Sequence, residues 1–350
     1  MMQRRTLLAA LAATVTARAA EPVTIRFGFA NVGVDNRQFS GGNFLATAHA
    51  GHYIENELKD LPGVKVEYAF FKGAGPAVNE AFANGQLDFA SQGDLPQIIA
   101  RANGLKTRQL AAGGAHAPMY VAAPPASPIR TIKDLKGRKV ALFRGTNNHL
   151  AAVKVLAANG MTERDLQGIN MDEASANAAL ATGNIDAAFG NYGVLLLADK
   201  GLAKIVYSTK GQDPAFERQS TLIAADTFVD GHPDLTQRVV TGIVKAAYWS
   251  SQEENREALF DLWTRSGRPA SVYRADFQDQ TLKYRNSPLI DDYLINAYRV
   301  QAQQAREYGL IRHTVSVDDW FDARFLNAAL AQLDLEHFWP RYGADGKPQS

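Results

Sequence analysis

The sequence predicts an α/β protein of two lobes, each a mixed, mainly parallel sheet flanked by helices, with a cleft between the lobes and a helical C-terminal region. Three observations predict this fold. The chain has 350 residues, which is more than a single hydrophobic core usually organises. Strand-like and helix-like runs alternate from its start, as in βαβ units. One helix-and-strand unit also occurs twice along the chain.

The first lobe is expected to begin with alternating strands and helices, identified by the spacing of their apolar residues. These elements are residues 23–29 (strand), 44–58 (helix), 64–71 (strand), 76–83 (helix), 87–90 (strand) and 95–102 (helix). Asp94 can cap the last helix, with Pro96 in its first turn. Four glycines follow helical runs, where a left-handed backbone is favoured: Gly85, Gly104, Gly160 and Gly183.

The repeated unit lies in residues 79–90 and 177–188, which align without gaps and share six of twelve positions. Each copy is predicted to be a helix, a glycine that ends it, and a short strand opened by an aspartate, Asp88 or Asp186. A chance match between alanine-rich helices is the alternative. The repeat favours two lobes built on one plan.

Two irregular stretches suggest where the chain crosses between the lobes. Proline-rich residues 122–128 interrupt regular structure before residues 135–142, a loop that feeds the first strand of the second lobe, and residues 208–220 are polar. From Pro233 onward the pattern is helical, and this third should pack on the first lobe. We therefore expect lobe I at residues 20–121 and 219–350, lobe II at 122–218, and hinges near residue 122 and within 208–220.

The first nineteen residues have the pattern of an export signal. Arg4 and Arg5 precede an apolar run at residues 6–16, and Ala17-Arg18-Ala19 offers small residues at a cleavage site. A buried helix or a membrane anchor is the alternative, but this run is too short to span a bilayer. We expect cleavage after Ala19 or one residue later, by Sec or twin-arginine export, and a periplasmic protein.

Composition and motifs exclude several function classes. With 37 basic and 36 acidic residues, no overall charge draws the protein to nucleic acid or a membrane. The chain has no Cys, and it lacks the signatures of serine hydrolases, phosphate-loop NTPases, dinucleotide-binding enzymes and zinc metalloproteases. His49, His52 and Glu55 share a helix side, as surface helices often show. We expect no catalytic residue, no metal and no cofactor.

Four loops that follow strands are rich in glycine and polar residues. Ligands of open parallel sheets bind beyond the carboxyl ends of strands and face helix N-termini, which attract anions. The loops together favour an anion-binding cleft, although each alone could be a well-capped turn. The candidate ligand-binding residues are Lys72, Gly73, Gly75, Ser91, Gln92, Gly93, Asp94, Arg144, Gly145, Thr146, Asn147, Asn191 and Tyr192.

Within this set, Arg144 is expected to meet two oxygens of the anion with its fork of donors, and Lys72 adds a second positive charge. Thr146 and the backbone of Asn147 supply further donors. Asp94 would repel an anion, so it is assigned to capping its helix or to gripping an amino group of the ligand.

Two segments also resemble a known family. Residues 70–96, FFKGAGPAVNEAFANGQLDFASQGDLP, resemble the segment of SsuA-type aliphatic-sulfonate-binding periplasmic proteins that runs F-x-x-G-P-x-x-x-E-A, G-x-x-D-F, then G-D-x-P. Residues 134–141 are similar to the opening of that family's second lobe. The resemblance covers residues 23–250 and extends to the nitrate/sulfonate/taurine group of ABC-transporter substrate-binding proteins. Residues 190–193, GNYG, depart from the Trp-Asp-Pro of many relatives.

The resemblance implies a type II periplasmic binding protein. Such a monomer would capture a small organic anion, above all an alkanesulfonate, by hinge closure and deliver it to an inner-membrane ABC permease for sulfur metabolism. Taurine, an aryl sulfonate, a sulfate ester and nitrate are alternative ligands. An enzyme of the thiamine-precursor synthase kind would need cysteines, which the chain lacks. A sensor would need a transmembrane segment or an attached domain.

Overall fold

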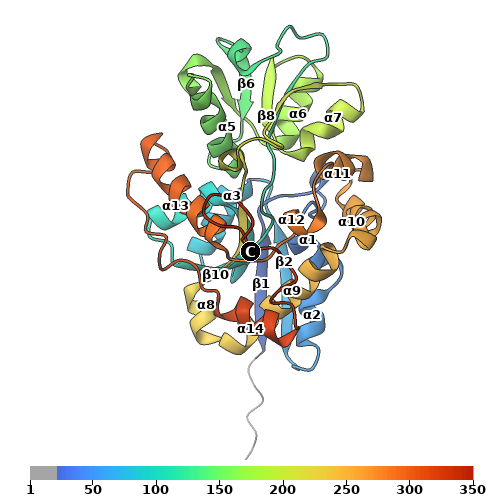
Figure 1. Ribbon diagram of the computed structural model, residues 1–350, viewed down its shortest axis with the longest axis vertical. Helices are drawn as coiled ribbons and strands as arrows, with labels where there is room; N and C mark the ends of the chain where they lie inside the picture. The colour runs from blue at the N-terminus through green and yellow to red at the C-terminus, as the bar shows by residue number, and fades with distance from the viewer. Residues whose placement is uncertain (1–21, 350) are drawn as a thin grey trace, which may run out of the picture.

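The computed structural model describes residues 22–349 and shows two lobes, with the second lobe uppermost and largely green in Figure 1. Each lobe contains one five-stranded sheet flanked by helices, which confirms the predicted fold class. No helix within residues 22–349 is long and apolar enough to cross a membrane. The expected export signal at residues 1–19 lies outside the described residues.

The first sheet has the strand order β2-β1-β3-β10-β4, in which only β10 runs antiparallel to its neighbours. Its strands are β1 (Val23–Phe29), β2 (Val64–Phe70), β3 (Phe89–Gly93), β4 (Thr107–Ala112) and β10 (Ser220–Ala225). The helices between them are α1 (Phe44–Ala50), α2 (Tyr53–Leu58), α3 (Ala74–Ala83) and α4 (Asp94–Ala102).

The second sheet has the order β7-β6-β8-β5-β9, in which β5 is the antiparallel strand. Its elements are β5 (Tyr120–Ala123), β6 (Lys139–Leu142), α5 (Asn147–Ala158), β7 (Gln167–Asn170), α6 (Glu173–Ala181), β8 (Ala187–Gly190), α7 (Leu195–Asp199) and β9 (Lys204–Ser208). In each sheet the antiparallel strand is the first one after the chain arrives from the other lobe. The two lobes therefore share one topology.

The C-terminal third is helical, as predicted. Its helices are α8 (Asp226–Gly231), α9 (Pro233–Ser250), α10 (Arg256–Trp263), α11 (Ala270–Asp276), α12 (Leu282–Arg285), α13 (Asp292–Glu307) and α14 (Arg324–Gln332). Helices α9 and α14 bury apolar side chains against Phe27 and Phe29 of β1 in the core of the first lobe. Helix α13 packs on α4, and α11 also contacts α7 of the second lobe.

The repeat in the sequence is a repeat in the structure. Gly85 ends α3 with φ +64°, and Gly183 follows α6 with φ +70°. Asp88 Oδ2 accepts the N–H of Arg26 at 2.8 Å, and Asp186 Oδ2 accepts the N–H of Lys139 at 2.8 Å. Each aspartate thus ties the start of its strand to the neighbouring parallel strand, which explains why both copies carry it.

Two expectations about secondary structure were wrong. The helix expected at residues 44–58 is broken between α1 and α2, where His52 adopts a left-handed backbone with φ +55°. Strand β5 was not expected, because it is only four residues long and is followed directly by two prolines. In chain order β5, not β6, is therefore the first strand of the second sheet. The predicted boundary at residue 122 falls inside β5. The lobe ranges stay a prediction.

The contact between α9 and α2 yields a stability prediction. A Cβ on Gly242 of α9 would lie 2.8 Å from the carbonyl oxygen of Tyr53 and 3.1 Å from Cα of Ile54. Gly242→Ala must push the helices apart, so we expect a loss of about 1–3 kcal/mol in the free energy of unfolding, measured with urea. A Cβ on Gly231 of α8 meets nothing within 4 Å, and Gly231→Ala is the control. Equal stability of the two variants would contradict the close packing.

Candidate functional site

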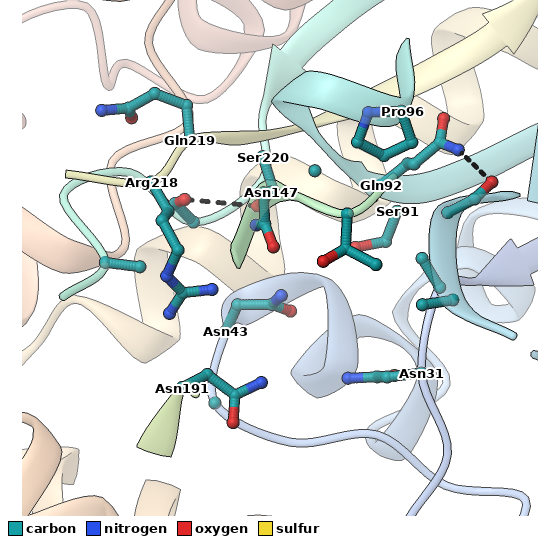
Figure 2. A pocket seen from close by; sticks show the side chains of 18 of the residues that line it. Asn31, Asn43, Ser91, Gln92, Pro96, Asn147, Asn191, Arg218, Gln219 and Ser220 are labelled. Carbon is teal, nitrogen blue, oxygen red and sulfur yellow. Dashed lines mark hydrogen bonds between the residues drawn. The ribbon is translucent and has the colours of Figure 1, made fainter. Parts of the chain in front are cut away.

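A cavity of about 140 Å³ lies between the lobes. The first lobe contributes Asn31 after β1, Asn43 before α1, and Ser91 and Gln92 of β3. The second lobe contributes the N-terminal turn of α5 and the loop after β8, and the chain that returns to the first lobe adds its residues 218–220. Figure 2 shows these side chains converging on one space. The cleft thus draws its walls from both lobes and from a crossover.

The walls of this cavity are suited to an anion. None of the described residues that line it is acidic, and many carry side-chain amides, including Asn43, Asn147 and Asn191. Helix α5 begins at the cavity with Asn147, and its first N–H groups have no acceptor within the helix. These donors and the partial positive charge of the helix start favour a negative ligand.

Arg218 supplies the full positive charge. Its side chain is 7% exposed, and Nε and Nη2 donate to the carbonyl of Pro118 at 3.1 and 2.7 Å. Nη1 forms no hydrogen bond within residues 22–349, and no carboxylate there lies within 4 Å of the guanidinium. Burial lowers the pKa of Arg218, while the more distant charges of Asp276 and Asp94 partly offset that effect. A buried cation without an ion partner is costly, so the site gains by admitting an anion.

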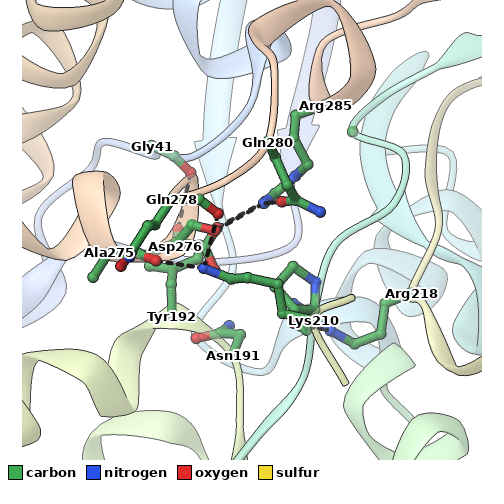
Figure 3. Close-up of polar contacts among 12 residues, drawn as sticks. Gly41, Asn191, Tyr192, Lys210, Arg218, Ala275, Asp276, Gln278, Gln280 and Arg285 are labelled. Carbon is green, nitrogen blue, oxygen red and sulfur yellow. Dashed lines mark hydrogen bonds and ion pairs between the residues drawn. The ribbon is translucent and has the colours of Figure 1, made fainter. Parts of the chain in front are cut away.

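The second arginine in the wall, Arg285, is already neutralised. Its Nη2 donates to Asp276 Oδ2 at 2.7 Å, and its Nη1 donates to Gln280 Oε1 at 2.8 Å. Tyr120 of β5 donates to the other oxygen of Asp276 at 2.9 Å. Figure 3 shows Asp276, Gln280 and Arg285 on one side of Arg218. Lys210, which donates to the carbonyl of Ala275, lies on the same side. Of the two described arginines that line this cavity, Arg218 is therefore the one available to balance the charge of a ligand.

The structure brings eight of the thirteen predicted site residues to the wall of this cavity: Gly75, Ser91, Gln92, Gly93, Thr146, Asn147, Asn191 and Tyr192. Lys72 lines an adjoining chamber, with Nζ 3.9 Å from Asp172 Oδ2. Gly73 and Gly145 line neither space. Most residues chosen from the loops after strands therefore line this cavity. This agrees with the rule that clefts of parallel sheets lie beyond the carboxyl ends of the strands.

Arg144 and Asp94 point to other partners. Arg144 donates through Nε and Nη2 to Glu163 Oε2 at 3.2 and 3.1 Å, outside the cavity. Asp94 is 1% exposed and accepts the N–H of Gln219 at 2.8 Å and that of Leu95 at 2.6 Å. Asp94 therefore holds α4 to the returning crossover and does not line this cavity.

Sequence reasoning missed Arg218, Asn31 and Asn43. Asn43 had a usable signal, because an asparagine directly before a helical run is a typical N-cap, and its Oδ1 accepts the N–H of Ala46. Arg218 lies in the irregular stretch already identified as a crossover, but nothing in the pattern told which way its side chain points.

Helix α5, whose first residue lines the cavity, also carries a buried lysine. Lys154 of α5 is 5% exposed and donates to the carbonyl of Ala215 in the returning crossover. Burial lowers its pKa to about 8, although Asp94 and Glu217 act in the opposite direction. Lys154 thus joins the second lobe to the connection between the lobes.

His49 and His52 do not form a ligand set. His49 packs edge-on against Tyr68 and Phe70, and burial lowers its pKa to about 4. Among the described residues, no three His, Cys, Asp or Glu side chains group closely enough to hold a metal ion.

Comparisons with known proteins agree with this geometry. Residues 46–256 match a family described as NMT1/THI5 like. The chain is 33% identical over 170 residues to an Escherichia coli K12 protein named as an aliphatic sulfonates-binding protein. That match covers 47% of this chain and 48% of the E. coli protein, about half of its length.

Solved structures extend the match to the whole fold. The sulfonate ABC transporter's periplasmic sulfonate-binding protein, SsuA, from Methylobacillus flagellatus KT has a TM-score of 0.76 and 32% identity. The alignment covers 92% of this chain and 98% of that one. The desulfurization enzyme DszB shares the fold, with a TM-score of 0.65 and 18% identity.

Lys154 yields a pH-dependent prediction. Its pKa of about 8 in the folded protein is below the ordinary 10.5, so the unfolded chain binds more protons between these pH values. The free energy of unfolding should therefore rise with pH across that window, by up to roughly 3 kcal/mol. Urea unfolding below pH 8 and near pH 10.5 measures the rise, and Lys154→Met should abolish it. If the free energy of unfolding of Lys154→Met rose by the same amount, the pH dependence would belong to another titratable group.

Proposed function

Because the chain belongs to the NMT1/THI5-like family, we propose that it is a periplasmic solute-binding receptor of an ABC importer, which captures a small organic anion and delivers it to an inner-membrane permease. The anion is above all an alkanesulfonate. One observation carries the proposal: a buried guanidinium, that of Arg218, faces a cavity, and among the described residues no carboxylate lines that cavity or pairs with Arg218. Export by a cleaved signal at residues 1–19 and a monomeric state belong to the same proposal.

A sulfonate matches the site in charge and shape. It stays ionised at physiological pH, carries one negative charge, and presents three oxygens that each accept hydrogen bonds. Arg218 balances that charge, while the hydroxyl of Ser91, the amide of Asn43 and the first N–H groups of α5 supply donors. Each hydrogen bond to a charged group contributes about 1.5–3 kcal/mol, so a few of them give a tight site.

The connection between the lobes supports capture by closure. The two crossovers, residues 113–119 and 209–219, lie side by side: the N–H of Ala117 donates to the carbonyl of Arg218 at 3.2 Å, and the reverse bond measures 2.9 Å. His116 Nδ1 lies 2.6 Å from Glu217 Oε2 in the same pair. A short two-stranded connection can flex while both lobes stay rigid, so ligand contacts from both lobes favour the closed form.

Binding without turnover is the reading that the relatives' names favour, and an enzyme is the competing function, because DszB shares the fold. DszB has been crystallised with biphenyl-2-sulfinic acid, and hydrolysis of a sulfinate yields the hydrocarbon and sulfite. Incubating the purified protein with alkyl and aryl sulfinates, followed by detection of released sulfite, therefore separates the two functions. Release of sulfite would show that the protein acts as an enzyme and would contradict the receptor function.

The role of Arg218 can be tested by calorimetry at fixed salt. Arg218→Gln should weaken binding of a simple alkanesulfonate by about 10- to 100-fold, because a charge-assisted contact is lost. Arg144→Gln is the matched control and should leave the affinity unchanged, since Arg144 pairs with Glu163 outside the cavity. If Arg144→Gln weakened binding and Arg218→Gln did not, Arg144 would be the residue that binds the anion.

Closure can be followed by small-angle scattering. A tightly bound sulfonate should reduce the radius of gyration, because the lobes approach each other about the two crossovers. Neutral sugars should leave it unchanged. Identical radii with and without a saturating sulfonate would rule out capture by hinge motion.

A further inference from the structure

Tyr192 joins the two lobes directly, apart from the crossovers. It lies in the loop after β8 of the second lobe, and its hydroxyl donates to the carbonyl of Gly41 at 2.9 Å (Figure 3). Gly41 belongs to the first lobe, just before α1, and is 151 positions away in the chain. Both residues line the cavity between the lobes. Hinge opening would separate them, so this hydrogen bond belongs to the closed form.

The tyrosine ring packs closely against a glycine of the first lobe. A Cβ on Gly42 would lie 2.9 Å from Cε1 and 3.1 Å from Cζ of Tyr192, and Gly42 has φ +88°, where any side chain is strained. The ring also packs on apolar clusters of both lobes. One cluster contains Val194 of the second lobe, and the other contains Ala46 of α1 and Trp263 of α10. The first lobe therefore offers this ring a matching surface.

Two contacts fix the orientation of Tyr192. Asn191 Oδ1 accepts the N–H of Gly193 at 2.8 Å, which holds the loop on both sides of the tyrosine. The guanidinium of Arg268 lies 5.3 Å from the centre of the tyrosine ring and is ion-paired with Glu173 at the start of α6. Arg268 lies between α10 and α11, so this ion pair is a further link between the second lobe and the C-terminal region.

The hydroxyl of Tyr192 does not offer its hydrogen to an anion. A tyrosine hydroxyl carries one hydrogen, and here the carbonyl of Gly41 receives it. Burial raises the pKa of Tyr192, so the hydroxyl keeps this hydrogen at neutral pH. The oxygens of a sulfonate only accept hydrogen bonds, and one hydrogen does not serve both partners. Tyr192 therefore lines the cavity without donating to the ligand.

From these contacts we infer that Tyr192 is a latch for the closed form, a positioning residue that holds the lobes together and does not select the ligand. The inference rests on the proposed function, since it takes capture by closure as given. A ligand escapes from the open form, and a contact made only in the closed form lowers the population of the open one. Loss of the latch should therefore raise the dissociation rate of every ligand by the same factor.

Stopped-flow measurements with methanesulfonate and butanesulfonate test the latch. Tyr192→Phe keeps the ring and removes only the hydroxyl, so it should speed dissociation of both ligands by one common factor, about 3- to 10-fold. The association rates, which depend on the open form, should not fall. Unchanged dissociation rates, or factors that differ between the two ligands, would overturn the inference and leave the receptor function standing. If the unaltered protein binds neither sulfonate, the proposed function fails and the inference fails with it.

Tyr298→Phe is the matched control. The hydroxyl of Tyr298 on α13 lies 3.3 Å from Oγ1 of Thr221 on β10, within the first lobe, and neither residue lines the cavity. The substitution removes a buried hydroxyl contact of the same kind, but one that does not join the lobes. It should leave both dissociation rates as they are in the unaltered protein. If Tyr298→Phe sped dissociation as much as Tyr192→Phe, the effect would not depend on a contact between the lobes, and the latch would be refuted.

Discussion

The guanidinium of Arg218 is the charge around which the cleft is organised. A buried cation needs compensation, and here the carboxylates of greatest effect are kept from providing it directly. Asp276 is bound to Arg285 and Tyr120, and Asp94 is occupied by two backbone N–H groups. The charge of Arg218 thus remains available at the cavity wall, which is why the site suits an anion and not a neutral solute.

The topology of the sheets places that charge. In each lobe the strand that follows a crossover inserts antiparallel into an otherwise parallel sheet, and this turns the carboxyl ends of both sheets toward the same space. The residues before β10 must then run through the cleft, which carries Arg218 and Gln219 into its wall. The same segment belongs to the two-stranded connection between the lobes. Under the proposed hinge motion, the anion would be held by the element that allows closure.

Much of the fold follows from local pattern. The bounds of β1 were predicted to the residue, and the glycine and aspartate of each repeat had a local role that the structure confirms at Asp88 and Asp186. Local pattern failed where tertiary contacts outweighed propensity. Strand β5 is too short to be recognised alone and exists because β8 and β9 pair with it, while the break at His52 interrupts an unbroken helical pattern.

For the site, the sequence by itself determined which loops border the cleft, because the local spacing of apolar and capping residues predicts where strands end and helices begin. Ser91, Asn147 and Asn191 were identified in this way, and all three line the cavity. Only the tertiary structure decided which charge enters it. Arg144 pairs with the carboxylate of Glu163, nineteen positions away in the chain, whereas Arg218 pairs with no carboxylate within residues 22–349. Side-chain direction and pairing depend on contacts between distant segments, and a single sequence does not show those contacts.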